Sequence, residues 1–162
     1  GPPGADGATG ANGAGGGGQV KITADVVSSV TSLADVTGLS FPVTANRYYS
    51  FTFWVRFQTA ATTTGAQYAL NGPANTFFVY RTETSLTAAA TGAPTFRTAR
   101  AANVGSASAS VDAVTSNLLC LIQGIIQPTT NGTIQVRHAT EIAASNLTTK
   151  AGSCGVIFDF GT

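Results

Sequence analysis

Charged side chains are scarce in this chain. Lysine, arginine, aspartate and glutamate make up 9% of its 162 residues, whereas soluble domains average about 25%. The formal net charge is +1, so the chain lacks the basic surface with which proteins bind nucleic acid or anionic membranes. Threonine, serine, alanine, asparagine and glycine are abundant instead. This neutral, hydroxyl-rich composition favours an extracellular or virion protein that packs against copies of itself.

Cysteine and methionine are rare or missing. Cys120 and Cys154 are too few for a disulfide scaffold or a zinc site, and both fall in strand-like segments, where an unbridged buried thiol is favoured over a Cys120–Cys154 disulfide. Because the chain has no methionine, we expect residue 1 to be a cut, with more stalk upstream. No apolar stretch approaches the roughly 20 residues of a membrane-spanning helix, which predicts no membrane insertion.

Signatures of catalysis are also missing. The single histidine, His138, falls by alternation on the apolar face of a strand and has no nucleophile elbow to accompany it, so a core or interface histidine is predicted. No phosphate-binding loop, metal-ligand cluster or dinucleotide fingerprint occurs. We therefore expect no enzyme and no cofactor. The seven carboxylates are scattered singly, and a polysaccharide-cleaving enzyme with a carboxylate pair is the alternative that sequence distance leaves open.

Glycine, in contrast, recurs at every third position over residues 1–16. Three polyproline-II-like chains wind around a common axis only where the axial residue has no side chain, so this period predicts a collagen-like triple helix and a homotrimer. The axial residues are Gly1, Gly4, Gly7, Gly10, Gly13 and Gly16. The alternative is a flexible linker like residues 15–18, although linkers have no reason to keep register. Five proline-poor triplets span only roughly 45 Å, so we assign assembly to the β-rich remainder of the chain.

Residues 1–18 are thus a stalk and glycine-rich hinge, and residues 19–162 are long enough for one domain with its own core. The clearest strand is 47–59, where apolar residues from Phe51 to Phe57 alternate with polar ones. Trp54, on the polar face, is predicted to pack under a loop or a neighbouring subunit. After a turn at 60–65, residues 67–70 are expected to pair back.

Further alternating or apolar segments predict more strands. They are 19–23, 36–43, 76–82, 95–99, 106–114, 118–126, 133–140 and 155–160. Residues 118–126 are apolar on both faces and predict a central strand, Asn131-Gly132 predicts a hairpin turn, and only residues 25–36 have room for a helical turn. In the last strand, Val156, Phe158 and Phe160 share one face. Eight to ten strands between turns predict an all-β antiparallel sandwich, jelly-roll-like.

Short motifs in a fixed order along residues 20–158 carry a resemblance to known proteins. They are Asp35-Val36-Thr37-Gly38-Leu39-Ser40-Phe41, Tyr49-Ser50-Phe51-Thr52-Phe53, Ala61-Thr62-Thr63-Thr64-Gly65, Asn71-Gly72-Pro73, Gly132-Thr133-Ile134-Gln135-Val136-Arg137, Ala139-Thr140-Glu141 and Lys150-Ala151-Gly152-Ser153. With the collagen-like repeat before them, they resemble the C-terminal head domains of tailed-bacteriophage fibres and related virion appendages.

The resemblance implies a trimeric structural protein at the virion surface, in a fibre or a capsid or tail decoration. Its partners would be its own copies, other virion proteins and a glycan or protein of the host surface. No receptor-binding residue can be carried over, and loops 60–65 and 86–94 are the candidate contact surfaces. Arg137 and Glu141 occupy the motif's charged positions and are expected to form a structural ion pair.

A cellular alternative explains the stalk equally well. It is a secreted or spore-surface collagen-like glycoprotein whose trimerising head resembles the jelly rolls of complement C1q and tumour necrosis factor. The ordered motifs favour the phage interpretation of the head, and the presence of the chain in purified virions would distinguish the two.

Overall fold

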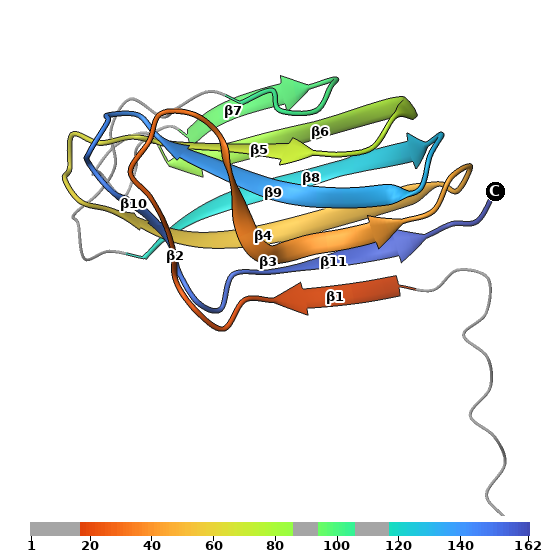
Figure 1. Cartoon of the computed structure of the whole chain (residues 1–162), viewed down its shortest axis with the longest axis horizontal. Helices are drawn as coiled ribbons and strands as arrows, with labels where there is room; N and C mark the ends of the chain where they lie inside the picture. Colours follow the sequence, from red (N-terminus) through yellow and green to blue (C-terminus); the bar gives the residue numbers. More distant parts are fainter. Residues whose placement is uncertain (1–16, 86–93, 106–116) are drawn as a thin grey trace, which may run out of the picture.

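The computed structural model describes residues 17–85, 94–105 and 117–162 (Figure 1), and all regular structure within them is β-strand. The glycines of the repeat and the expected strand at 106–114 lie outside these residues. Every strand pairing within the described ranges is antiparallel. The pairings are β1–β11, β2–β10, β4–β10, β4–β11, β3–β9, β4–β8, β5–β9, β6–β7 and β6–β8.

The strands form two sheets that face each other. The larger sheet follows the order β1 (Gly17–Lys21), β11 (Cys154–Asp159), β4 (Tyr49–Thr59), β8 (Leu118–Pro128), β6 (Asn75–Ser85) and β7 (Pro94–Ala99). Beside this path, β10 (Leu147–Thr149) pairs with β4 and with β2 (Val26–Ser28). The smaller sheet follows the order β3 (Ala34–Val43), β9 (Gly132–Thr140) and β5 (Ala66–Asn71). The predicted all-β antiparallel class is confirmed.

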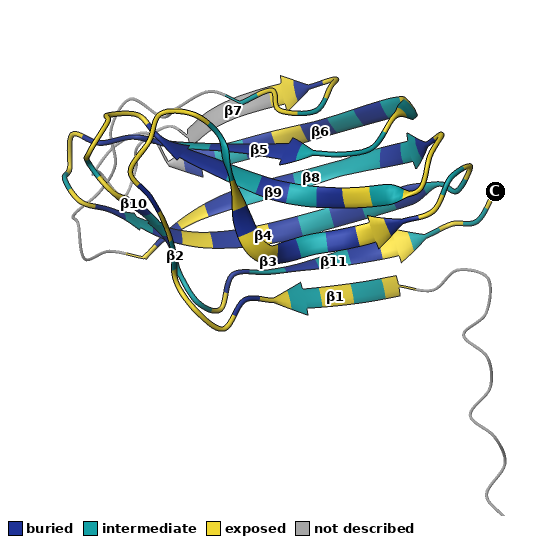
Figure 2. Cartoon of the chain, viewed as in Figure 1, coloured by how far each residue is buried: buried dark blue, intermediate teal, exposed yellow. Residues whose placement is uncertain are grey.

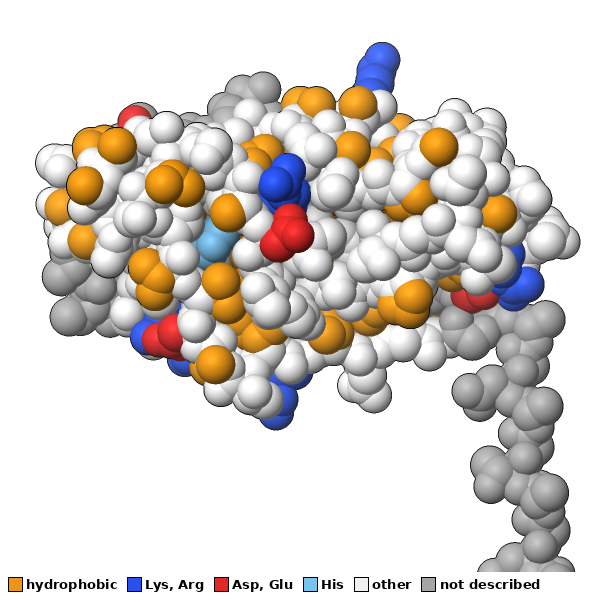
Figure 3. Space-filling view, viewed as in Figure 1, with side chains coloured by type: hydrophobic (Ala, Val, Ile, Leu, Met, Phe, Trp, Pro, Cys, Tyr) orange, Lys and Arg blue, Asp and Glu red, His pale blue; other side chains and the backbone are white. Residues whose placement is uncertain are grey.

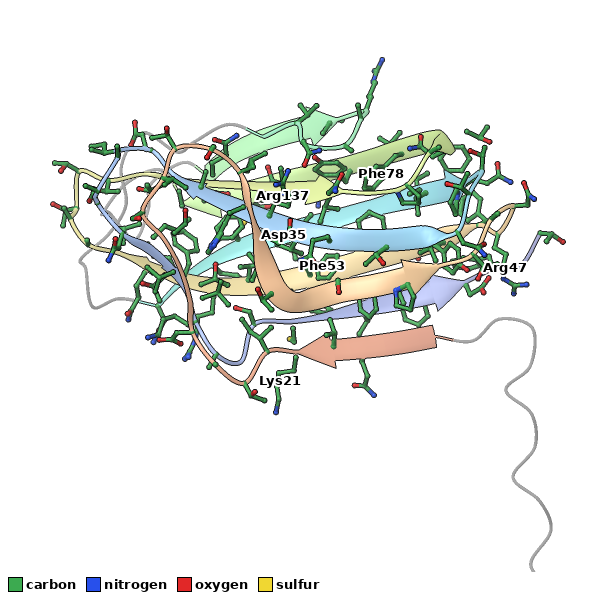
Figure 4. The ribbon with its side chains drawn as sticks, in the orientation of Figure 1. Lys21, Asp35, Arg47, Phe53, Phe78 and Arg137 are labelled. Atoms are coloured by element: carbon green, nitrogen blue, oxygen red, sulfur yellow. The ribbon has the colours of Figure 1, made fainter. Side chains whose placement is uncertain are left out.

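The core lies between the two sheets, where the inward faces of their strands meet. Phe53 of β4 and Phe78 of β6 point into this layer (Figure 4) and are almost fully buried. Phe53 packs on Phe41 of the smaller sheet, with ring centroids 5.3 Å apart. The alternation predicted for 47–59 is confirmed, because Phe51, Phe53, Val55 and Phe57 are all buried while the residues between them are not. Figure 2 shows the buried residues concentrated in the strands and the exposed ones in the connections.

Strand β8 holds the central position expected for residues 118–126, between β4 and β6. Its inward residues Cys120, Ile122 and Ile126 are fully buried. On its outward face, however, Leu119 is 51% exposed, so this apolar strand is covered on one side only.

Two expected hairpins are wrong. Residues 67–70 do not pair back on β4, because β5 crosses to the smaller sheet and pairs with β9. Nor does Asn131-Gly132 close a hairpin, since β8 and β9 belong to different sheets. Asn131 instead accepts a hydrogen bond from the amide of Ala45, 2.9 Å. In both cases the turn residues would allow the chain to fold back on the preceding strand. The chain instead crosses to the other sheet, because the apolar face of each strand is then buried against the facing sheet.

The helical turn considered for 25–36 is also wrong, because this segment contains β2 and the start of β3. The short strands β2 and β10 give no clear alternation because each has only three residues. The last strand shows Val156 and Phe158 on the outward face, while Gly155 and Ile157 point inward and are buried.

Both ends of the described chain lie at the same end of the sandwich (Figure 1). Gly17, the first residue of β1, pairs with Phe158 of β11, and the amide of Tyr48 donates to the carbonyl of Gly161, 2.7 Å. We call this the stalk end, because the glycine repeat precedes Gly17 directly. We call the opposite end, formed by residues 29–33, 60–65 and 141–146, the tip.

Candidate functional site

The tip is assembled from three segments that are far apart in sequence. The amide of Ala60 donates to the carbonyl of Asn146, 2.8 Å, and the hydroxyls of Thr64 and Ser145 lie 2.6 Å apart. The amide of Ala144 donates to the carbonyl of Ser29, 2.9 Å. These bonds join each segment to a neighbour, so the tip is an ordered surface rather than a set of separate loops.

Apart from Glu141, the side chains of the tip are uncharged, and most are small, hydroxylated or apolar. Thr62 and Thr63 are exposed on the 60–65 segment. Val30 and Ile142 leave 47% and 45% of their surface exposed on the other two segments. Surfaces with so few charges bind mainly by shape, hydrogen bonds and apolar contact. Of the two predicted contact loops, 60–65 lies at the tip, and 86–93 lies outside the described residues.

Glu141 fixes the base of the tip. Its carboxylate Oε2 accepts a hydrogen bond from the amide of Gly65, 2.7 Å, and its own amide donates to the carbonyl of Gly65, 3.0 Å. Glu141 therefore links the segments 60–65 and 141–146 by hydrogen bonds and is not a partner of Arg137.

The expected Arg137–Glu141 ion pair is thus wrong. Arg137 instead donates from Nε to Asp35 Oδ1, 2.9 Å, and its other nitrogens donate to the carbonyl of Leu33 and to Asn103, 2.8 and 2.9 Å. Glu141 lies just beyond the end of β9, about 13 Å from Arg137 along the chain, and each side chain is held by a different partner. Figure 4 shows Arg137 beside Asp35, and Figure 3 shows from the same side a face with few charged side chains.

Two further ion pairs link segments next to strands of the larger sheet. Arg47 donates to Asp159 at the stalk end, 2.6 Å, and Lys150 contacts Asp25. Hydrogen bonds from Lys150 and the amide of Ala151 lower the pKa of Asp25. Burial alone would raise the pKa of Asp159, but hydrogen bonds from Arg47 and from the amide of Gly161 outweigh it and lower the pKa. A general acid of a glycosidase needs a raised pKa instead, so neither carboxylate fits that role.

His138 is a core residue, as predicted, with 1% of its surface exposed. Its Nδ1 lies 2.8 Å from the hydroxyl of Thr149, which also lies 2.8 Å from the hydroxyl of Tyr68. Burial lowers the pKa of His138 to about 4 and raises that of Tyr68. Both groups are therefore neutral at neutral pH and join β9, β10 and β5 through one threonine.

The two cysteines are unbridged, as favoured from the sequence. Cys120 is buried and accepts a hydrogen bond from the hydroxyl of Thr84, 3.2 Å. Burial raises the pKa of the Cys120 thiol to about 12, which makes it an inert apolar residue. Cys154 is half-buried on the outward face of the larger sheet.

Three open hollows mark the surface of the described residues, all near β1. One of about 490 Å³ is lined by residues 21–27 with Thr37 and Gly38. Two others, of about 430 and 270 Å³, share Gln19 and Val156 along β1 and β11. Trp54, 39% exposed, lines the larger of these two beside Cys154.

The described residues contain no group of three or more His, Cys, Asp or Glu side chains arranged to hold a metal ion. They also include no helix of the length and apolar character needed to cross a membrane. Sequence reasoning located the 60–65 segment of the tip, but it missed 29–33 and 141–146, which join it only through long-range contacts.

Comparisons with known proteins match solved structures alone, and at low similarity. No family model matches the chain, and no curated protein does. Among solved structures, the chain is similar to the VP2 subviral particle of infectious bursal disease virus, with 8% identity, a TM-score of 0.30 and 90% of this chain covered. The Gt strain of that virus gives 10% identity, a TM-score of 0.30 and 98% coverage. The chain spans 40% of the length of each viral chain, and TM-scores this low support no conclusion about fold or function.

Proposed function

We propose that this chain is the trimeric head domain of a bacteriophage fibre or of a capsid or tail decoration protein, carried on a collagen-like stalk. In this role the stalk end faces the particle, and the tip contacts a glycan or protein of the host surface. The observation that carries the proposal is that the glycine repeat joins one end of the sandwich while the ordered tip lies at the other.

The separation of the two ends supports this orientation. Gly17 pairs with Phe158, which pairs with Ser50 near the start of β4, and Thr59 ends the same strand at the tip. Thr59 lies nine positions after Ser50 along β4, a distance of about 30 Å in an extended strand. If the stalk is attached at Gly17, the tip is therefore the end of the head that lies furthest from the stalk.

The strand order supports the jelly-roll interpretation of the head. A jelly roll contains eight strands in two four-stranded sheets. Seven of the strands here have the places that this fold requires. They are β1-β11-β4-β8 in the larger sheet and, facing them, β3-β9-β5 in the smaller one. The eighth strand, β6, pairs with β8 in the larger sheet rather than with β5, so the fold departs from the jelly roll there.

The composition of the tip supports adhesion through many weak contacts. Three heads on one stalk raise the effective concentration of each tip once the first is bound, so no single strong site is needed. The tip segments are also joined to a rigid sandwich by hydrogen bonds. Recognition loops are usually found on rigid scaffolds of this kind.

The location is tested by immunogold labelling of purified virions with an antibody against residues 17–162. We expect label on projections from the particle. Label confined to cell or spore surfaces, with none on virions, would overturn the phage proposal and favour the collagen-like cellular glycoprotein.

The role of the tip is tested by adsorption of virions that carry Thr63→Arg. An arginine on the exposed 60–65 segment should slow adsorption to host cells, because it adds a bulky positive charge to a contact surface with few charges. The matched control is Thr133→Arg, which changes an exposed threonine near the start of β9. Equal adsorption by both variants would exclude the tip as the contact surface.

A further inference from the structure

The outward face of the larger sheet carries an apolar surface that nothing in the proposed function explains. We name it the outer-sheet patch; its members are Trp54, Leu121, Ile125, Val156, Phe158 and Phe160. Phe158 is 55% exposed, Phe160 67% and Trp54 39%. The inward positions of β11 hold only Gly155, Ile157 and the ion-paired Asp159, so this strand presents more apolar surface outward than inward.

The strand register places the patch members on one face of three neighbouring strands, with Ser50, Thr52 and Gln123 between them. Cys154 of β11 pairs with Trp54 of β4, which pairs with Leu121 of β8. Further along β11, Val156 pairs with Thr52 of β4. Two residues later, Phe158 pairs with Ser50 of β4, and Ser50 pairs with Ile125 of β8. Paired residues in a sheet have side chains on the same face. The patch therefore runs across the sheet from its middle to the stalk end.

Aromatic rings extend the patch at the stalk end. Phe160 packs edge-on against Tyr48, with ring centroids 6.0 Å apart, and Tyr48 packs against Phe77 of β6 at 5.4 Å. Phe77 faces outward, because its neighbour Phe78 is the buried residue of the pair.

Charged residues lie along the sides of the patch, including Glu83 of β6, which pairs with Leu121. Lys21 flanks it on β1, Arg56 lies beyond Trp54 toward the tip, and Arg81 lies on β6, where it donates to Gln123, 3.0 Å. An apolar centre with aromatic residues and an outer ring of charge is the composition of a protein–protein interface. The two adjoining hollows along β1 and β11, about 430 and 270 Å³, leave room for side chains of a partner.

The glycine repeat identifies that partner as a second copy of this chain. In the proposed collagen-like trimer the repeat winds three chains around one axis, and its last glycine, Gly16, directly precedes Gly17, the first residue of β1. Three copies of Gly17 would then lie close to that axis. Because Phe158 pairs with Gly17, the patch starts where the repeat enters the head, whereas the apolar residues of the tip lie about 30 Å further along the strands.

We infer that the outer-sheet patch is the interface between three copies of the head, with the larger sheets turned toward the three-fold axis and Phe158 beside it. This inference rests on the proposed trimeric head and specifies the surface that assembles it. It also gives Trp54 the neighbouring-subunit contact that its place in the sequence predicts.

The test compares two variants of the full chain by sedimentation velocity over a dilution series. Phe158→Glu places three like charges at the axis, and we expect it to raise the concentration at which half the trimer has dissociated by about a hundredfold, as for a central interface residue. The matched control is Ile142→Glu at the tip, 45% exposed, which should leave dissociation unchanged. Equal dissociation of both variants would overturn the inference.

A second measurement on the unaltered chain does not depend on the folding of a variant. Trp54 is the only tryptophan in the sequence, so its fluorescence reports on the patch alone. In the trimer, its emission should be blue-shifted and protected from acrylamide quenching, and dilution should reverse both. A trimer in which Trp54 is quenched as freely as in the monomer would exclude this face. A full chain that sediments as a monomer would instead contradict the proposed trimeric head.

Discussion

A single glutamate links two segments of the tip, and its contribution is measurable at one amide. Glu141→Ala removes the acceptor for the amide of Gly65, so we expect hydrogen exchange at Gly65 to accelerate by about tenfold, as for loss of a hydrogen bond to a charged group. Glu141→Gln keeps an acceptor oxygen and should show a smaller effect. Unchanged exchange in Glu141→Ala would show that this bond does not hold the loop.

The buried histidine makes stability depend on pH. The pKa of His138 is about 4 in the folded chain and about 6.5 when unfolded, so between these values only the unfolded chain binds the proton. The free energy of unfolding should therefore fall by about 3 kcal/mol as pH decreases through this window. The measurement is urea unfolding at fixed protein concentration.

The control for the histidine is His138→Gln, which does not titrate. Its free energy of unfolding should stay nearly constant from about pH 6.5 to about pH 4.5. The lowered pKa values of Asp25 and Asp159 mean that loss of their contribution begins at lower pH. A slope as steep in His138→Gln as in the unaltered chain would refute the assignment.

Among the strand elements, β8 depends on a residue without a side chain. A Cβ at Gly124 would lie 2.4 Å from the carbonyl oxygen of Val79 and 2.6 Å from Cβ of Tyr80. Because backbone atoms cannot move aside, Gly124→Ala should lower the free energy of unfolding by about 3 kcal/mol. In Gly161→Ala no atom lies within 4 Å of the new Cβ, and only backbone strain of about 1 kcal/mol is expected. Equal urea midpoints would contradict this packing.

The sequence allowed most strands to be predicted because their signals are local. Alternation from Phe51 to Phe57 and the apolar run of β8 are properties of neighbouring residues, and both predictions are confirmed. Pairing is not local. β5 and β9 come together across a separation of 74 residues, for instance from Ala66 to Thr140, and no turn motif encodes that choice.

The candidate site was less predictable for the same reason. Arg137 pairs with Asp35, which is 102 residues away in the chain. Glu141, only four residues away, instead accepts a hydrogen bond from the amide of Gly65 in the 60–65 loop. In β11 the alternation identified a shared face for Val156 and Phe158, but period alone does not say whether that face turns toward the core or away from it. That distinction depends on where the second sheet lies.

For the whole molecule, we expect the head to assemble without the repeat. A fragment of residues 17–162 keeps β1 and the outer-sheet patch, so sedimentation equilibrium at micromolar concentration should give a trimer, as for the full chain. The repeat would then continue a symmetry that the head sets. A monomeric fragment beside a trimeric full chain would assign assembly to the glycine repeat instead.

The location of both chain ends at one end of the sandwich has a practical consequence. The loop at 60–65 joins two strands of different sheets and carries no terminus, so foreign peptide grafted between Thr62 and Thr63 extends from the tip without crossing the stalk. In the proposed trimer, each grafted sequence would be displayed in three copies at the end remote from Gly17.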